Sequence, residues 1–391
     1  MRRVNVIGVG MTKFTTPKLK IPYTEMGPQA GRDALKDAGI DYKEIQQVYT
    51  GWVYGDSCAG ERVVYELGIT GVPIFNLNNN CSTGSNALFL ARQAVGAGVI
   101  ECALAVGFEQ MVPGALGAVF SDRPNPMEKY FVTLMKLQTM TQAPPAAQLF
   151  GGAGEEYQQK YGTQPETFAK ISVKARKHAQ HNDRAVFRDL LTVEEVMQSP
   201  HIYGPLTRFQ CCPPTCGAAA AVVCSDEFAK KHNISNPVYI AGQSMVTDFE
   251  SSFAQSRMRV VGYDMTRAAA DAVYQEAGLG PEDLDVVELH DCFTANELIT
   301  YEGLRLTPEG TAEKFINDND NTYGGKVVTN PSGGLLSKGH PLGATGLAQC
   351  AELTWQLRGQ AGVRQVPNAK VGLQHNIGIG GAAVVTMYRK Q

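Results

Sequence analysis

The chain contains one strand–helix–strand pattern twice, and this repeat limits its fold more than any other feature of the sequence. In the first half, "RVNVIGVGM" predicts a strand, an amphipathic helix ends at Ala38-Gly39, and "IQQVYTGW" predicts a second strand. In the second half, "NPVYIAGQSM", "MTRAAADAVYQEAGL" and "LDVVELHD" predict a strand, a helix and a strand in the same order. The second helix ends at Ala277-Gly278, and glycine is the residue expected just past a helix end. The sequence therefore predicts an α/β fold built from two similar halves.

The correspondence extends to the next elements of each half. "FNLNNNCSTGSNALFLARQAV" predicts a strand, a turn at Cys81 and a helix, and "NPSGGLLSKGHPLGATGLAQCAEL" predicts a glycine-rich approach, a turn at His340 and a helix. Aligning Cys81 with His340 also aligns Gly84 with Gly343. An apolar strand follows each helix, "CALAVGF" in the first half and "KVGLQHNIGIGGAAVVTMY" in the second. Chance similarity between two ordinary α/β segments is the alternative, but the order of strands and crossover helices favours a duplicated unit.

A long segment interrupts the repeat. Residues 1–118 are expected to form the first half, completed by about residues 206–230, and residues 231–391 the second half. The intervening residues 119–205 are rich in Met, Pro and Gly, and long excursions from a compact fold are usually functional. We therefore expect a loop domain over the ligand site. It includes a basic helix, either a phosphate-binding face or a solvated surface, with the residues Lys170, Lys174, Arg176, Lys177, His178 and His181.

Composition excludes several classes of function. The chain has 35 basic and 38 acidic residues and a net charge of −3, so nucleic-acid binding through a general basic field is not expected. No run approaches the ~18 apolar residues of a transmembrane segment, and "MRRVNVIGVGM" predicts a first strand rather than a signal peptide. Nine irregularly spaced cysteines are typical of a reduced intracellular protein. "CCPPTC" has no second ligand pair, so no metal site is expected.

Cys81 and His340 are candidates for a nucleophile and its base. Cys81 precedes a long helix, and the positive N-terminal end of that helix would favour the nucleophilic thiolate. His340 lies in the equivalent turn of the other half, so packing about a pseudo-twofold axis would bring the two side chains together. Taken singly, a core thiol and a capping or surface histidine are the alternatives.

Two further turns carry polar residues after predicted strands. In "VELHDCF", His290 and Cys292 are two residues apart, so on an extended strand both would point into one cavity, as an oxyanion donor and a proton carrier. In "LQHNIGIGG", the glycines permit backbone N–H groups to converge on an oxyanion, and His375 or Asn376 could line the cavity. Buried core residues and a structural turn are the alternatives.

The motifs "NNNCSTGS", "HDCF", "NPSGGLLSKGHPLGATGLAQCAEL" and "QHNIGIGG", in this order, resemble those of the thiolase superfamily over essentially the whole chain. "HDCF" is similar to the thiolase domain of sterol carrier protein x, where most other thiolases have Asn-Glu-Ala-Phe. The resemblance implies the thiolase fold, an α/β architecture with two duplicated halves in αβαβα layers and an inserted loop domain. The chain departs from the sterol-carrier pattern at Cys216-Gly217, where that pattern has Asp-Gly.

The resemblance also implies roles for individual residues. Cys81 matches the nucleophile that takes the acyl group, and His340 matches the residue that activates it and helps to form the first oxyanion hole. His290 stands where the family usually has an asparagine that positions a catalytic water in that hole. The backbone N–H groups of Cys81 and Gly378 would form the second hole.

The implied reaction is CoA-dependent thiolysis of a 3-oxoacyl-CoA to acetyl-CoA or propionyl-CoA and a shortened acyl-CoA. Asn376 stands where most thiolases have a proton-shuttling cysteine, so Cys292 is expected to take over that role. The subtype suggests medium or long, branched or sterol side-chain substrates. No bound cofactor is expected, and CoA is the co-substrate.

The resemblance further implies a homodimer and a peroxisomal location, although "MYRKQ" is not an import address; the cytoplasm and the mitochondrion are alternatives. Two other functions stay open. One is a catalytically silent acyl-CoA or lipid-binding protein on a thiolase scaffold, against which the intact Cys81, His290, Cys292 and His340 argue. The other is a decarboxylating condensing enzyme, which His375 alone favours.

Overall fold

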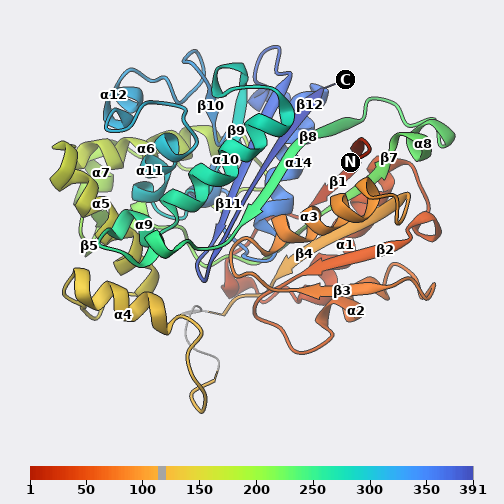
Figure 1. The fold of residues 1–391 in the computed structure, drawn as a ribbon, viewed down its shortest axis with the longest axis horizontal. Helices are drawn as coiled ribbons and strands as arrows, with labels where there is room; N and C mark the ends of the chain where they lie inside the picture. Colours follow the sequence, from red (N-terminus) through yellow and green to blue (C-terminus); the bar gives the residue numbers. More distant parts are fainter. Residues whose placement is uncertain (113–119, 391) are drawn as a thin grey trace.

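The computed structural model describes residues 1–112 and 120–390, and its fold is shown in Figure 1. Ten strands form one mixed sheet in the order β10-β9-β11-β12-β8-β1-β7-β4-β2-β3. The strands of the first half are β1 (Val4–Met11), β2 (Gln47–Gly51), β3 (Ile74–Leu77), β4 (Cys102–Glu109) and β7 (Gly217–Ser225). Those of the second half are β8 (Val238–Val246), β9 (Val286–Glu288), β10 (Val328–Thr329), β11 (Val371–Gly378) and β12 (Ala382–Lys390).

The strand order confirms the repeat. Read outward from the centre, the first half runs β1-β7-β4-β2-β3 and the second runs β8-β12-β11-β9-β10, so each strand occupies the place of its counterpart. In each half the outer pairs are parallel and the inner pairs are antiparallel. The halves join where β1 pairs with β8, at Asn5 with Tyr239 and Val6 with Val238. In Figure 1 the red and orange half therefore lies beside the teal and blue half.

Helices pack on the sheet in layers. The outer helices are α1 (Tyr23–Ala38) and α10 (Tyr263–Ala277), and the central ones are α3 (Thr83–Gly96) and α14 (Thr345–Arg358). Glycines in the strands permit the outer helices to come close: a Cβ on Gly8 would collide with the backbone of α1, and one on Gly242 would lie 2.8 Å from Val273 O of α10. Helix α14 contacts α3 and strands of both halves, including β7 and β11. This arrangement gives the expected α/β/α/β/α order.

The two helices end where the sequence predicts, whereas one predicted strand is in fact two strands. Gly39 and Gly278 follow α1 and α10 with φ of 68° and 64°, the left-handed conformation that glycine adopts without strain. The single strand expected over residues 370–388 is wrong. Gly380 and Gly381 have φ of 107° and 92°, so the chain reverses there and β11 pairs antiparallel with β12.

The inserted segment packs on the second half. Its elements are α4 (Glu128–Leu137), α5 (Pro145–Tyr161), α6 (Pro165–Ala179), α7 (Val193–Gln198), β5 (His201–Tyr203) and β6 (Leu206–Thr207). Helices α5 and α6 contact α11 (Thr294–Gly303), and Phe150 stacks on Phe293 with ring centroids 5.1 Å apart. Figure 1 shows these yellow-green elements beside α11. The boundary expected between residues 118 and 119 lies outside the described residues.

The interpretation of α6 as a phosphate-binding or wholly solvated face is wrong for half of its basic residues. Lys174, Arg176 and His178 are buried. The Lys174 ammonium contacts the carboxylate of Glu297, and His178 makes hydrogen bonds to Asn330 O and to the Thr322 hydroxyl. These side chains join α6 to the second half because tertiary packing covers the face that the sequence left open.

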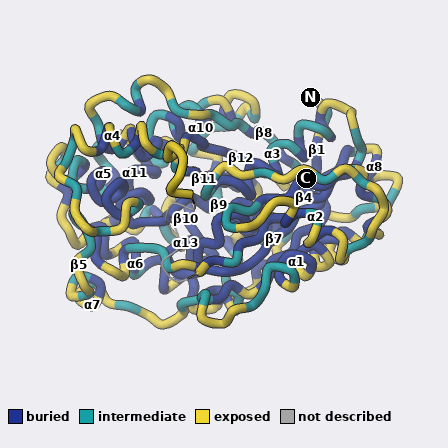
Figure 2. The backbone as a smooth tube through the Cα atoms, turned by 90° about the horizontal axis from the view of Figure 1, so that it is seen from below, coloured by how far each residue is buried: buried dark blue, intermediate teal, exposed yellow. Residues whose placement is uncertain are grey.

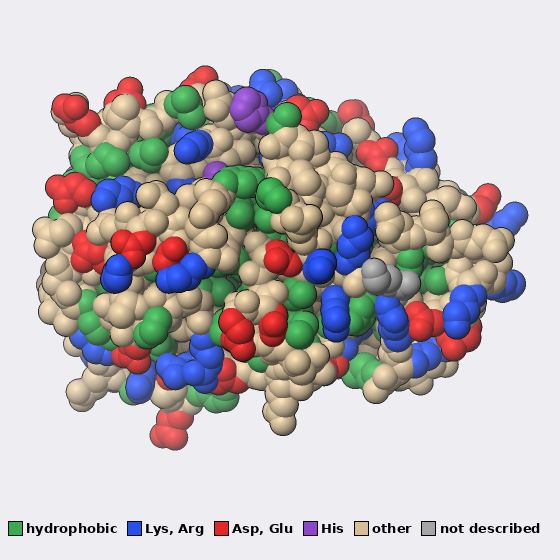
Figure 3. Space-filling view, turned by 90° about the horizontal axis from the view of Figure 1, so that it is seen from above, with side chains coloured by type: hydrophobic (Ala, Val, Ile, Leu, Met, Phe, Trp, Pro, Cys, Tyr) green, Lys and Arg blue, Asp and Glu red, His purple; other side chains and the backbone are tan. Residues whose placement is uncertain are grey.

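The remaining helices are short. They are α2 (Ala59–Val64), α8 (Asp226–Lys231), α9 (Arg257–Val260), α12 (Ala312–Asn317) and α13 (Gly334–Ser337). Figure 2 shows that the buried backbone gathers in the strands and the helices beside them. On the face shown in Figure 3, acidic and basic side chains are interspersed, as the small net charge predicts. Within the described residues, no helix has the length and apolar character to cross a membrane.

Candidate active site

Three predicted catalytic residues meet between the two halves. Cys81 Sγ, one ring nitrogen of His290 and one ring nitrogen of His340 all lie within 4.8 Å of one another. The two imidazole rings are nearly perpendicular, with centroids 5.0 Å apart and an interplanar angle of 87°. Cysteine and histidine are the residues of a nucleophile–base pair, and by type they are also ligands that zinc accepts.

The turn that carries Cys81 is fixed by its own polar neighbours. Asn80 adopts the left-handed conformation (φ 53°), which asparagine tolerates better than most residues. The hydroxyl of Ser82 donates to Asn79 O at 2.9 Å, and that of Thr83 donates to Asn80 O at 2.6 Å. The Asn80 amide also donates to Ile379 O at 2.8 Å. Cys81, two residues before α3, is thereby placed against the glycine-rich turn of the other half.

Cys81 is a neutral thiol in the ligand-free site. Burial, followed by the charge of the nearby Glu109 carboxyl group, raises its pKa to about 12. The expected thiolate at the helix N-terminus is therefore wrong for the ligand-free state, because desolvation outweighs the favourable end of the helix. A base must accept the thiol proton when sulfur attacks.

His340 has the environment of that base. Its Nδ1 lies 2.7 Å from Thr345 Oγ1, and the Thr345 hydroxyl donates to Pro341 O at 3.0 Å. Because the hydroxyl proton is used, Nδ1–H is the donor to Thr345, and Nε2 carries a lone pair. Nε2 is buried and has no hydrogen-bond partner among the described residues. Burial, followed by the charge of Lys338, lowers the pKa of His340 to about 3 and keeps the ring neutral.

His340 lies in the turn expected before the second helix, but farther from that helix than Cys81 lies from its own. It is five positions before the first residue of α14, whereas Cys81 is two positions before the first residue of α3. Pro341 O accepts from the backbone N–H groups of Ala344 and Thr345, which makes a turn before the helix begins. The aligned glycines nevertheless meet, since a Cβ on Gly84 would lie 2.7 Å from Gly343 O.

His290 and Cys292 follow β9 in a loop, so the expectation that both lie on an extended strand is wrong. His290 Nδ1 is 2.8 Å from Asn376 Nδ2, and burial lowers the pKa of this histidine well below its usual value. Burial raises the pKa of Cys292, and the neighbouring thiols of Cys212 and Cys81 raise it further. Asp291 points elsewhere and accepts backbone N–H groups at the start of α13, from Leu335 at 2.7 Å.

The glycine-rich turn contributes backbone rather than side chains. A Cβ on Gly378 would collide with Asn79 O, so only glycine permits this approach to the Cys81 turn. His375 is fully buried, with Nε2 2.9 Å from the Thr266 hydroxyl. Asn376 is also fully buried and contacts Ser85 and His290. The expectation that His375 and Asn376 line the substrate cavity is therefore corrected: both lie in the wall behind His290.

Sequence reasoning missed the segment "CCPPTC" as a wall of the site. The backbone N–H of Cys212 donates to Cys292 O at 2.9 Å, Pro214 forms a β-bridge with His340, and the Thr215 hydroxyl accepts from His340 N–H at 3.1 Å. The cysteines are free thiols. The concentration of Cys and Pro in this segment was the one feature that could have indicated a role, and it does not indicate which other residues the segment contacts.

Glu109 was missed as well. Its carboxyl group is buried at the end of β4 and accepts backbone N–H groups from Val53 at 3.1 Å, Tyr54 at 2.9 Å and Gly343 at 3.0 Å. Burial raises its pKa to about 7 despite these donors. Glu109 thus connects the two central turns and adds negative charge near Cys81.

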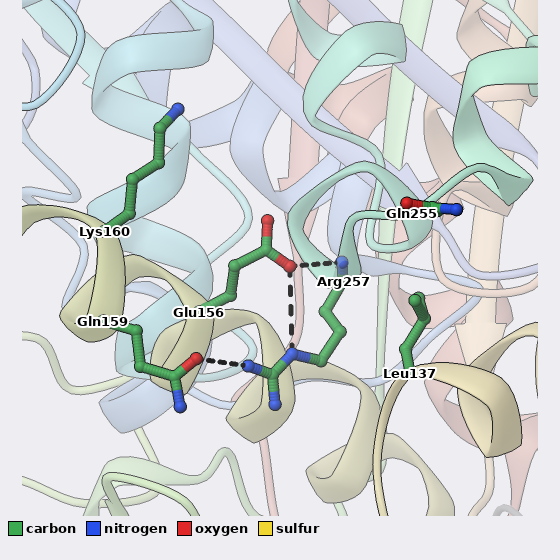
Figure 4. Close-up of a pocket in the computed structure, with 6 residues that line it drawn as sticks. All are labelled: Leu137, Glu156, Gln159, Lys160, Gln255 and Arg257. Atoms are coloured by element: carbon green, nitrogen blue, oxygen red, sulfur yellow. Dashed lines mark hydrogen bonds and ion pairs between the residues drawn. The ribbon is translucent and has the colours of Figure 1, made fainter.

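A surface pocket of about 450 Å³ lies between α5 and α9, away from the Cys81 cluster. It is lined by Leu137, Glu156, Gln159, Lys160, Gln255 and Arg257 (Figure 4). The Arg257 guanidinium contacts Glu155 at 2.5 Å and Gln159 at 3.1 Å, and Lys160 contacts Glu309 at 2.9 Å. Because Arg257 and Lys160 are both paired with other side chains of the protein, the pocket is a polar contact between helices rather than a second ligand-binding site.

Comparison with known proteins identifies the fold and the family. The model of the thiolase N-terminal domain matches residues 4–227, and that of the thiolase C-terminal domain-like family matches residues 249–389. Sterol carrier protein 2 of Oryctolagus cuniculus is 56% identical over 392 residues, which cover 99% of this chain and 72% of that protein. Among solved structures, the Ltp2–ChsH2(DUF35) aldolase superposes with a TM-score of 0.85 at 22% identity, covering 99% of this chain and 98% of that one. Human mitochondrial 3-ketoacyl-CoA thiolase superposes with a TM-score of 0.74 at 20% identity, covering 100% and 99%. The chain belongs to the thiolase family of acyltransferases.

Proposed function

We propose that this chain catalyses the CoA-dependent thiolysis of 3-oxoacyl-CoA to acetyl-CoA or propionyl-CoA and a shortened acyl-CoA. The observation that carries the proposal is the cluster of Cys81, His290 and His340 within 4.8 Å, together with His340 Nε2, which has no hydrogen-bond partner in the part of the chain that the structure describes. A silent acyl-CoA or lipid binder needs neither a nucleophile nor a base with a free lone pair. The similarity to sterol carrier protein 2 supports medium or long, branched or sterol side-chain substrates.

In the first half-reaction, Cys81 Sγ attacks the 3-keto carbon and its proton passes to His340 Nε2. The backbone N–H groups of Cys81 and Gly378 stabilise the oxyanion at that carbon. The C2–C3 bond then breaks, the acyl group stays on Cys81, and the acetyl-CoA or propionyl-CoA leaves as an enolate. His290 stabilises the enolate oxygen, and the Cys292 thiol donates its proton to C2.

In the second half-reaction, the Cys292 thiolate takes the thiol proton of an incoming CoA. The CoA sulfur attacks the acyl carbon on Cys81, and the Cys81 thiolate leaves. His340 returns its proton to Cys81, so both groups are again neutral, as burial favours. The cycle consumes one CoA, needs no bound cofactor and leaves every residue as it began.

The test is a thiolysis assay on acetoacetyl-CoA and a 2-methyl-branched 3-oxoacyl-CoA, with acyl-CoA products separated by chromatography. Cys81→Ala is expected to abolish turnover, and Cys292→Ala to lower it by ~10²–10⁴-fold, the usual worth of a positioned proton carrier. Cys58→Ala changes an exposed thiol and serves as the control. Tight binding of CoA esters without turnover by the wild type would contradict the proposal and favour a silent binder.

We also propose a homodimer that forms through β3, and a peroxisomal location by the same family resemblance. β3 is an edge of the sheet, paired only with β2 within the described chain. It exposes Phe75 (43%), and Tyr65 and Ile69 nearby in the sequence are exposed at 50% and 80%. Open strand edges with exposed apolar side chains are sites of association. Light scattering should find a dimer that Phe75→Lys weakens and Val99→Lys, at another exposed apolar residue, does not.

A further inference from the structure

We propose that Gln374, Ser85 and Asn376 form a hydrogen-bonded relay that decides which nitrogen of His290 carries its proton. The relay makes His290 present Nε2–H, the donor that the enolate oxygen needs. This inference rests on the proposed function and adds three positioning residues to it. None of the three touches the reacting atoms; each acts through the His290 ring.

The relay begins at the backbone carbonyl of Gly346, which can accept hydrogen bonds but cannot donate one. Gln374 Nε2 donates to the backbone carbonyl of Gly346 at 2.8 Å and to Ser85 Oγ at 2.8 Å. Gln374 Oε1 accepts from the Tyr388 hydroxyl. A carbonyl oxygen has no proton to give, so the nitrogen end of the Gln374 amide must face Gly346.

The donor and acceptor roles fixed at Gln374 then determine those of Ser85, Asn376 and His290 in turn. Ser85 Oγ accepts from Gln374 Nε2 and donates its one proton to Asn376 Oδ1 at 2.7 Å. Because Asn376 Oδ1 is the acceptor there, its amide nitrogen faces His290 Nδ1 at 2.8 Å. An amide N–H donates to a lone pair, so Nδ1 is unprotonated and the proton of the neutral ring is on Nε2.

Burial and close packing maintain this order of donors and acceptors. Ser85, Gln374 and Asn376 are all fully buried, so water does not compete for their hydrogen bonds. Gly346 leaves the room for them, since a Cβ there would collide with Ser85 Oγ and would lie 2.8 Å from Asn376 Oδ1. The neighbouring His375 Nδ1 accepts from the backbone N–H of His290 at 3.5 Å. The ring of His290 is therefore constrained at its backbone and at Nδ1.

The proton positions also decide what the cluster can bind. His340 offers a lone pair, His290 offers an N–H group, and Cys81 offers a thiol. A metal ion would need lone pairs from both imidazoles, and His290 could provide one only by reversing the relay. A carbonyl or enolate oxygen beside a nucleophile fits the three groups without change.

Asn376→Asp is the sharpest test, since it keeps the shape of the side chain and replaces the donor by an acceptor. A carboxylate at this place requires a proton on His290 Nδ1, which removes the proton from Nε2 while the ring stays neutral. At about pH 8.5 we expect kcat for thiolysis to fall by about 10–100-fold with KM little changed. As the pH is lowered the ring gains a second proton, Nε2–H returns, and the difference from wild type should narrow. A constant ratio across the pH range would overturn the relay.

A double-mutant cycle separates positioning from a general structural loss. Asn376→Leu and Ser85→Ala should lower kcat in the wild-type background but have little effect after His290→Asn, because an asparagine has no tautomer to fix. Equal losses in both backgrounds would contradict the proposal. Gln349→Leu is the matched control: it removes a buried amide that donates to His375 O at 3.0 Å on the same strand, without contacting the relay. It should leave the pH profile unchanged.

A direct reading does not depend on turnover. In wild-type protein labelled with ¹⁵N-histidine, the His290 ring nitrogens should show the Nε2–H tautomer, and those of Asn376→Asp should not. An Nδ1–H tautomer in the wild type would overturn the relay even if thiolysis is found. Absence of thiolysis by the wild type would instead overturn the proposed function, with the tautomer still measured.

Discussion

Cys81 is partly buried and His340 is buried, and desolvation keeps both groups uncharged. Burial raises the pKa of the thiol to about 12 and lowers that of the imidazole to about 3, so proton transfer between them in the empty site is unfavourable. Charge separation becomes favourable when attack places negative charge on a substrate oxygen near N–H donors. Under the proposed function, the thiol therefore stays neutral until a substrate carbonyl is bound.

Thr345 determines which nitrogen of His340 is free. Thr345→Val removes the acceptor of Nδ1–H and leaves that group buried without a partner, so the tautomer that presents the Nε2 lone pair loses its support. We expect kcat for thiolysis to fall by about 10–100-fold, as for other residues that orient a functional histidine. Thr345→Ser should restore most of the activity, and Thr354→Val, buried on the same helix, should retain it. Equal activity of the Val and Ser variants would contradict this role.

At the scale of elements, the site exists because α3 and α14 approach without side chains between them. A Cβ on Gly84 would lie 2.7 Å from Gly343 O and 3.1 Å from Leu347 N, both backbone atoms that cannot turn aside. Glu109 ties the same region to β4 through Gly343 N–H. The turns that carry Cys81 and His340 are therefore positioned by backbone contacts of the central layer rather than by flexible side chains.

Gly84→Ala should force the two central helices apart. We expect a loss of about 1–3 kcal/mol in the free energy of unfolding, the usual cost of overpacking, and a fall in thiolysis as Cys81 moves from His340. Gly96→Ala, at the other end of α3, is the control, because its nearest neighbour is the flexible sulfur of Met1 at 3.1 Å. Urea unfolding of both variants measures the difference; equal stability would show that the helices repack easily.

At the scale of the whole molecule, buried ionisable groups make stability depend on pH. Burial lowers the pKa values of His178, His340 and His375 to about 3, from 6.5, so their contribution is present above about pH 6.5 and is lost as the pH falls toward 3. Burial raises the pKa of Glu109 to about 7, from 4.5, and that of Asp291 to about 8, from 3.8, so their contributions are present at low pH and are lost as the pH rises through 7 and 8.

The two effects have opposite signs and largely offset each other below about pH 6.5. Above that pH the histidines are neutral in both states, so only the carboxyl groups still titrate, and we expect the free energy of unfolding to fall between about pH 6.5 and about pH 8. Urea titrations at these two pH values, at one protein concentration, provide the measurement. Undiminished stability at the higher pH would mean that Glu109 and Asp291 are already charged in the folded protein at the lower one.

The sequence by itself determined the elements that depend on neighbours along the chain. The repeated strand–helix–strand order, the helix ends at Gly39 and Gly278, and the turns that carry Cys81 and His340 follow from periodicity and from the conformational freedom of glycine. The motifs were enough to indicate the family, which the comparisons confirm. The reversal at residues 379–381 could have been suspected from its two adjacent glycines.

The tertiary structure alone decided the protonation and direction of the groups in the site. Burial reversed the expected ionisation of Cys81 and moved Lys174 and His178 into the interior. The contact of Ser85 with Asn376 joins residues 291 positions apart, from different halves of the chain. Such effects depend on which atoms exclude water and which donors meet which acceptors, and neither is encoded in the local pattern of a segment.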